Sequence, residues 1–115
     1  MKNNIDAEKV SLSIIPQGMK TTIGEILELV KADINATDEL EGLDFEIVDM
    51  IVFGSRTKNK ARKNSDIDIL LQYKGKARED DMFNAFHRIK TKIDNIIVDI
   101  TPINEPIKKW LKRMK

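Results

Sequence analysis

The sequence predicts a small α/β domain of the α+β kind, in which a mixed β-sheet is flanked by helices. Three segments are rich in β-branched and aromatic residues with alternating polarity, and these are the expected strands: 45–55, 65–73 and 95–103. Three other segments repeat apolar residues at helical spacing: 21–34, 80–93 and 104–115. Because helices and strands interleave along the chain, we expect one sheet with helices packed against it.

Length and composition indicate one soluble domain spanning residues 1–115. The chain has 115 residues, 41% of them hydrophobic and 34% charged, which suits one modest core. Its net charge of +1 provides no global field toward nucleic acid or membrane. The absence of cysteine excludes disulfides, thiolate metal sites and a cysteine nucleophile. The polar N-terminus and the lack of a roughly 20-residue apolar run predict a cytoplasmic location.

The N-terminal third should contain one helix. Residues 10–16 favour β structure and stop at Pro16, so residues 1–18 are expected to hold either an edge strand or an ordered arm. A capping box of Thr22 and Glu25 marks the start of the helix over 21–34. Its apolar stripe consists of Ile26, Leu27, Val30 and Ile34.

The remaining elements follow from alternation and from end signals. Strand 45–55 should end at Gly54, and the polar run 56–64 should form a short helical turn and a loop. Helix 80–93 has acids in its first turn and basic residues near its end. Its predicted apolar stripe is Met82, Phe86, Ile89 and Ile93. We expect Pro102 to close strand 95–103, and Asn104 to cap the last helix with Pro106 in its first turn.

Asp66 and Asp68 should lie on the same face of a strand, opposite Ile67. Two carboxylates about 4 Å apart repel by about 4 kcal/mol at an effective dielectric constant of 20. A divalent cation removes that penalty, and carboxylate oxygens suit Mg²⁺ or Mn²⁺, which also coordinate phosphates. Asp99, in the middle of strand 95–103, could help to hold a second ion or take a proton from an incoming hydroxyl.

The loop before these acids has the composition of a phosphate site. Gly54 permits close approach of backbone to a ligand, and Ser55 offers a hydroxyl and an N–H at an expected helix start. Five cations follow, which would favour a triphosphate arriving with its metal: Arg56, Lys58, Lys60, Arg62 and Lys63.

Each feature alone has a simpler interpretation. An Asp-x-Asp pair is most often a solvated strand face, Gly-Ser is a common turn, and loop cations usually face water. Asp99 could equally cap a neighbouring turn. The combination, in this order and at this spacing, favours a metal-dependent catalytic site.

His87, the single histidine, is expected to pack against neighbouring residues or to lie on the surface. The apolar side of helix 104–115 either packs on the core or docks a partner or second copy.

The segment "IVFGSRTKNKARKNSDIDILL" resembles the signature of the DNA polymerase β-like nucleotidyltransferase superfamily, and in detail the minimal nucleotidyltransferases. The resemblance implies that Asp66, Asp68 and Asp99 hold Mg²⁺ (or Mn²⁺). It also implies that the nucleotide is bound by four residues: Gly54, Ser55, Arg56 and Ser65. One departure is that Asn59 and Lys60 stand where relatives commonly have a glycine.

By resemblance, the chain would transfer a nucleoside monophosphate, usually AMP from ATP, to a hydroxyl. In minimal members that hydroxyl belongs to a HEPN-domain toxin, and the enzyme is the antitoxin. Two alternatives remain: a binding module that neutralises a partner by occlusion, and an aminoglycoside-type enzyme that modifies a small molecule. A homodimer could complete the acceptor pocket in the latter case. Nucleic acid is not expected as the acceptor, since a chain of 115 residues lacks the additional domains that grip it.

Overall fold

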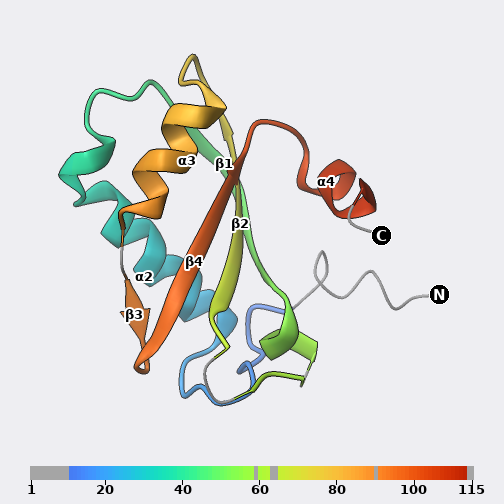
Figure 1. The fold of residues 1–115 in the computed structure, drawn as a ribbon. Helices are drawn as coiled ribbons and strands as arrows, with labels where there is room; N and C mark the ends of the chain where they lie inside the picture. Colours follow the sequence, from blue (N-terminus) through green and yellow to red (C-terminus); the bar gives the residue numbers. More distant parts are fainter. Residues whose placement is uncertain (1–10, 59, 63–64, 90, 114–115) are drawn as a thin grey trace.

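The computed structural model describes residues 11–58, 60–62, 65–89 and 91–113. Figure 1 shows a sheet with helices on both sides. The α-helices are α2 (Ile23–Asn35), α3 (Glu79–His87) and α4 (Ile107–Arg113). The strands are β1 (Glu46–Phe53), β2 (Ile67–Lys74), β3 (Lys92–Ile93) and β4 (Ile96–Ile103). The described residues also form two short 3₁₀ helices, η2 (Asp38–Leu40) and η3 (Ser55–Lys58).

The sheet is mixed, with strand order β1-β2-β4-β3. Strand β2 pairs with β1 antiparallel and with β4 parallel, and the short β3 pairs with β4 antiparallel. Helices α2 and α3 cover one face, while α4 lies on the opposite side (Figure 1). The predicted α+β class with a mixed sheet and flanking helices is therefore confirmed.

Two apolar clusters hold these layers together. The larger joins one face of β2, including Ile67 and Ile69, to α2 and α3, and its members are almost fully buried. The smaller, on the other face, joins Leu70 to Ile107 and Leu111 of α4. Burial of β2 on both faces explains why its sequence is apolar at consecutive positions as well as at alternate ones.

Helix α2 forms as its end signals predict. The Thr22 hydroxyl accepts a hydrogen bond from the Glu25 N–H, and the Glu25 carboxylate accepts one from the Thr22 N–H, so the capping box is present. Ile26 and Val30 are buried, as expected of its core-facing stripe. The local signals thus fix both the start of the helix and the face that it buries.

The prediction of a helix through residue 93 was wrong. Helix α3 ends at His87, and Ile93 belongs to β3, where it pairs with Ile96. Asp94 and Asn95 form the turn of this hairpin with φ of 54° and 67°. Aspartate and asparagine tolerate positive φ better than most residues, so they suit a two-residue hairpin turn. Sequence periodicity did not separate this short strand from the apolar stripe of a helix.

The C-terminal boundaries also differ from expectation. Pro102 lies inside β4, which continues to Ile103. Among the described strands, only the short β3 pairs with the outer edge of β4, through Lys92 and Ile93. Because this edge has no described strand partner beside Pro102, the missing N–H of Pro102 leaves no ladder hydrogen bond unmade there. Asn104 does not cap α4; its N–H donates to the Glu79 carboxylate at 3.2 Å.

Helix α4 packs on the core through its apolar side. Ile107 and Leu111 are buried, which matches the core-packing alternative for this helix. The Pro106 carbonyl accepts from the N–H groups of Lys109 and Trp110 and so begins the helix. The sequence also predicts Met114 on the apolar side of this helix, but Met114 lies outside the described residues.

The described residues before α2, 11–22, form turns and bends. Residues 11–22 contain no strand, and Val10 lies outside the described part of the chain. The N–H groups of Ile23 and Gly24 donate to the carbonyls of Ile14 and Leu12, at 2.8 Å each. The described part of this segment is therefore tied to the first turn of α2. Within the ranges the structure describes, no helix combines the length and apolarity needed to cross a bilayer.

Candidate active site

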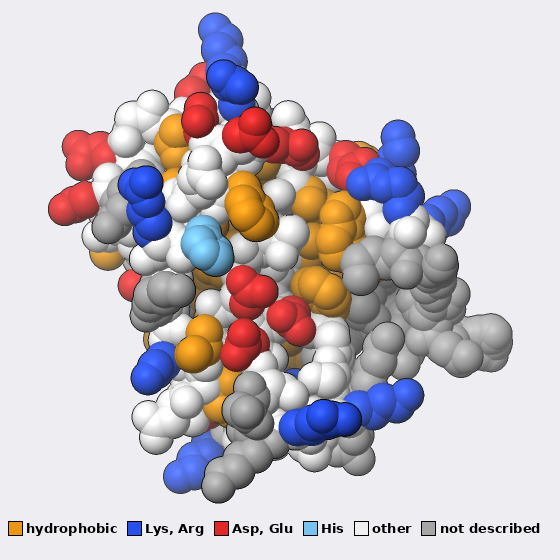
Figure 2. Space-filling view, viewed as in Figure 1, with side chains coloured by type: hydrophobic (Ala, Val, Ile, Leu, Met, Phe, Trp, Pro, Cys, Tyr) orange, Lys and Arg blue, Asp and Glu red, His pale blue; other side chains and the backbone are white. Residues whose placement is uncertain are grey.

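Asp68 and Asp99 are partners in the parallel ladder between β2 and β4. Neighbouring strands lie about 4.8 Å apart, so partnered side chains on one face are adjacent. Asp68 is half-buried and Asp99 is exposed, while the exposed Asp66 stands just before β2 begins. Figure 2 shows acidic side chains gathered over the centre of the sheet, with Lys and Arg side chains below them.

The three carboxylates influence one another. The pKa of Asp68 is raised to about 6, mainly because burial penalises its charged form and further because the charges of Asp99 and Asp66 oppose it. Both neighbours therefore lie close enough to affect the charge of Asp68. A site with this unfavourable charge density gains from a bound cation.

Gly54 lies against the central acid. Its φ is +98°, and a Cβ built on it would lie 2.6 Å from Oδ2 of Asp68. The preceding Phe53 is the partner of Asp68 in the β1–β2 ladder. The expected proximity of the Gly-Ser turn to the acidic strand is thus present, and only a residue without a side chain fits at this point.

The loop after Gly54 is held by its own residues. The Gly54 carbonyl accepts from the hydroxyl of Thr57 at 2.7 Å, and the Ser55 carbonyl accepts from the Lys60 N–H at 2.9 Å. The hydroxyl of Ser65 accepts from the Arg62 N–H at 2.9 Å. These bonds fix the path of the described part of the loop between the turn and the acids.

Arg56 is buried, whereas a cation in a loop usually faces water. Its side chain is only 5% exposed. Nε and Nη2 donate to the Ser65 carbonyl at 3.0 and 2.6 Å, and Nη1 donates to the Gln17 carbonyl at 2.7 Å. Direct contact of Arg56 or Ser65 with a nucleotide stays a prediction. Lys60 and Arg62, by contrast, are exposed.

The residues present suit a hard divalent ion. Clustered carboxylate oxygens are the ligands that Mg²⁺ and Mn²⁺ prefer, and Asp66, Asp68 and Asp99 would supply them. Within the described ranges, no three acidic, histidine or cysteine side chains are arranged so that they could hold a metal ion together. The ladder pairing nevertheless brings Asp68 and Asp99 together, and the charge of Asp66 acts on the same site.

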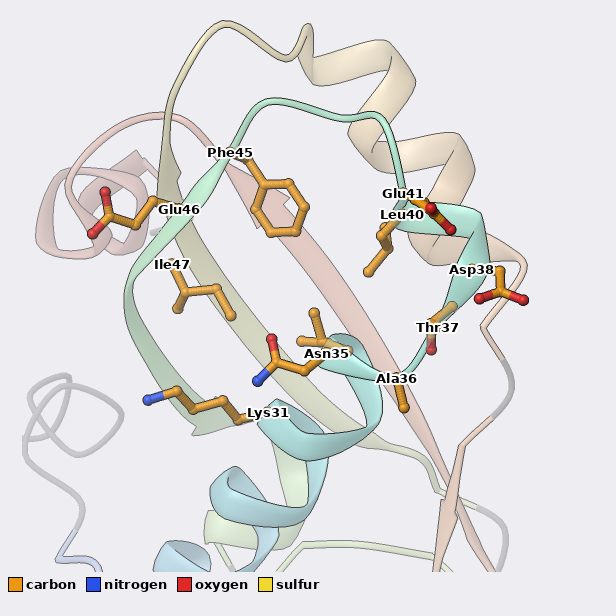
Figure 3. Close-up of a pocket in the computed structure, with 11 residues that line it drawn as sticks. Lys31, Asn35, Ala36, Thr37, Asp38, Leu40, Glu41, Phe45, Glu46 and Ile47 are labelled. Atoms are coloured by element: carbon orange, nitrogen blue, oxygen red, sulfur yellow. The ribbon is translucent and has the colours of Figure 1, made fainter.

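A separate cavity lies far from these acids. It has a volume of about 620 Å³ and lies between the end of α2, η2 and the start of β1. Figure 3 shows Lys31, Asn35 and Phe45 around it. Since Gly54 follows the opposite end of the eight-residue strand β1, roughly 20 Å separates the two regions. This cavity is not part of the acidic site.

Sequence reasoning missed Gln17 and Gly18. Gln17 bonds to Arg56 and also accepts from the Ala61 N–H at 3.0 Å through its side chain. Gly18 has a φ of +81° and lies against the Arg56 guanidinium. No local pattern could have identified these residues, because their partners lie about forty positions away in the chain.

Residues 35–113 match the family model described as polymerase beta, nucleotidyltransferase. This range includes the turn at Gly54 and the three acids described above. No curated protein and no solved structure matched the chain. Because the family match spans more than half of the 115 residues, the chain belongs to the polymerase beta nucleotidyltransferase family.

Proposed function

We propose that this protein transfers a nucleoside monophosphate, AMP from ATP, to a hydroxyl group in the presence of Mg²⁺ or Mn²⁺. The observation that carries the proposal is the pairing of Asp68 with Asp99 across β2 and β4, directly beside Gly54. The family match supports nucleotidyl transfer in general. The nucleotide, the metal and the acceptor are parts of our proposal.

The proposed reaction uses these residues to bind the metal ion, to bind the phosphates and to accept a proton. Asp66, Asp68 and Asp99 would hold the divalent ion, which when bound would polarise the phosphate and stabilise developing negative charge. Gly54 leaves room for the Asp68 carboxylate. Ser55 would offer its N–H and hydroxyl to the phosphates.

The proposed step is a displacement at phosphorus. The acceptor hydroxyl oxygen forms a bond to the α-phosphorus of ATP, and the bond from that phosphorus to the pyrophosphate oxygen breaks. Pyrophosphate leaves with the electron pair, and the hydroxyl proton passes to the carboxylate of Asp99. Asp99 suits this role because it is exposed while its ladder partner Asp68 is half-buried.

We further propose that the acceptor is a hydroxyl on a HEPN-type protein and that modification neutralises that partner. The resemblance to minimal nucleotidyltransferases supports this assignment. The exposure of Asp66 and Asp99 also supports it, because a macromolecule can reach a site that opens on the surface. A protein that only occludes its partner, and one that modifies a small molecule, are the competing outcomes.

The test is transfer of label from α-³²P-labelled ATP with Mg²⁺ to a co-encoded HEPN-type protein. We expect label on the partner, lost with Asp68→Asn and with Asp99→Asn. Asp81→Asn, which changes an exposed carboxylate in the first turn of α3, is the matched control and should retain transfer. Equal transfer by wild type and both site variants would reject the proposed role of the acids.

Calorimetry separates the alternatives. An occluding module would bind the partner without binding ATP in the presence of Mg²⁺. Transfer of label to an aminoglycoside, but not to the protein, would instead favour the small-molecule enzyme. The mass of the protein in solution would then show whether a homodimer completes the acceptor pocket.

A further inference from the structure

We infer that residues 16–19, which precede the family match, position the loop between Gly54 and Asp66, which binds the nucleotide in the proposed function. Arg56 is the positioning residue through which they act on this loop. The family match begins at residue 35, so it assigns no role to this segment. The inference rests on the proposed function for its catalytic consequence. Its structural basis is independent of that function.

Arg56 is the first link. Among residues whose side chains the structure describes, it is the only buried charged one, at 5% exposure. Its guanidinium bonds twice to the Ser65 carbonyl and once to the Gln17 carbonyl. Ser65 directly precedes Asp66, so Arg56 fixes the chain at the point where it enters the acidic strand.

The N-terminal segment encloses this guanidinium. The Gln17 N–H donates to the Arg56 carbonyl at 3.1 Å, so the two residues bond in both directions. The Gln17 side chain accepts from the Ala61 N–H at 3.0 Å and thereby holds the far part of the loop. Pro16 and Met19, on either side, are buried and anchor the segment.

Gly18 is shaped for this contact. A Cβ at Gly18 would lie 2.7 Å from Nη1 of Arg56, and its φ is +81°. Gly42 has a similar φ of +90°, but nothing lies within 4 Å of the position of its Cβ. Alanine at either site suffers the same kind of backbone strain, but only alanine at Gly18 displaces the guanidinium.

Arginine is required because its planar fork can bond two carbonyl groups at once, whereas a lysine ammonium is a point charge. Loss of the fork would release Ser65 and let Asp66 and Asp68 shift relative to Gly54. A displacement of about 1 Å in a reacting constellation can reduce the rate by about a hundredfold. The segment thus acts on the chemistry through Arg56 and touches no reacting atom.

The experiment measures binding of a non-hydrolysable ATP analogue with Mg²⁺ to the full chain, together with the KM and kcat of transfer. We expect Arg56→Lys and Gly18→Ala each to lower kcat by roughly tenfold to a hundredfold, and both to weaken binding of the analogue. Arg88→Lys, an exposed arginine after α3, and Gly42→Ala should bind as wild type does. The effects of Arg56→Lys and Gly18→Ala should be non-additive, because both variants break the same contact.

The melting temperature distinguishes positioning from simple instability. Gly18→Ala should lower it more than Gly42→Ala, because its Cβ also displaces the buried guanidinium. Binding is therefore compared well below both melting temperatures, where each variant is folded, and only Gly18→Ala should then weaken it. Equal binding by these two variants, or additive effects of Arg56→Lys and Gly18→Ala, would overturn the inference.

Failure of the proposed function would look different. Wild type would then not bind the nucleotide at all. Amide hydrogen exchange would in that case test whether residues 16–19 hold the loop. In that case Ala61 should exchange faster in Gly18→Ala than in Gly42→Ala, and equal rates would overturn the link.

Discussion

Asp68 and Asp99 are ladder partners on the neighbouring strands β2 and β4, although thirty residues, including helix α3, lie between them in the sequence. Burial of Asp68, together with the charges of Asp99 and Asp66, raises the pKa of Asp68 to about 6. Two negative charges are thus held together by the sheet at a cost in stability that a cation would relieve. The next two predictions depend on this electrostatic repulsion.

Replacing Asp68 by asparagine should stabilise the metal-free protein while abolishing transfer. Asparagine keeps the shape of the side chain and removes the charge that burial and two neighbours oppose. We expect the melting temperature at pH 7 to rise by about 2–5 °C, measured by circular dichroism in EDTA. Asp81→Asn should not raise it, because Asp81 lies in the first turn of α3, where a negative charge is favourable.

The pH dependence of stability has a definite sign. The pKa of Asp68 rises from its ordinary 3.8 to about 6 in the folded chain. Between these values the folded state binds more protons than the unfolded state, so the contribution of Asp68 to stability falls as the pH rises through the window. Denaturant titrations from pH 4 to pH 7 should show this fall in wild type and a smaller one in Asp68→Asn. Identical slopes would contradict the assignment.

Metal binding should weaken in acid. A proton and a divalent ion compete for the Asp68 carboxylate, so Mn²⁺ affinity should drop about tenfold per pH unit below pH 6. Imidazoles also commonly titrate near this pH, so His87→Gln is the control. His87 is exposed and stacks on Phe83 with ring centroids 6.1 Å apart. If its replacement removed the pH dependence, Asp68 would not be the group responsible.

Alanine at Gly54 should abolish activity and destabilise the fold. Its Cβ would meet Oδ2 of Asp68 at 2.6 Å, and its φ of +98° is unfavourable for any residue with a side chain. We expect a loss of about 1–3 kcal/mol in the free energy of unfolding, measured in urea. Gly42→Ala, strained but uncrowded, should cost less and should retain transfer.

Removing the Trp110 ring should loosen α4. The ring packs edge-on against Phe53, with centroids 5.7 Å apart, and Phe53 immediately precedes Gly54. Trp110→Ala should lower the free energy of unfolding by about 2 kcal/mol, because Trp110 is only partly buried. Lys112→Ala, at an exposed position of the same helix, should have little effect. An unchanged stability would mean that this face of α4 serves docking instead of packing.

The sequence by itself determined the elements whose signals are local. The capping box at Thr22 sets the start of α2 within one residue. The alternation after Ser65 places Asp68 on the opposite face of β2 from the buried Ile67 and Ile69. Such features depend on residues a few positions apart, so one segment contains all the information.

Tertiary structure alone decided which distant residues meet. The register of the β2–β4 ladder sets Asp68 opposite Asp99, and this register cannot be read from the spacing of residues in the sequence. Arg56 is buried partly because it bonds to Gln17. The sequence around Gln17 has no pattern that identifies it, among the polar residues, as the partner of Arg56. Helix α3 ends at His87 because the chain turns back at Asp94 and Asn95 to pair with β4, and this pairing overrides the apolar period that suggested a longer helix. These outcomes are set by contacts between segments, which form only when the whole sheet assembles.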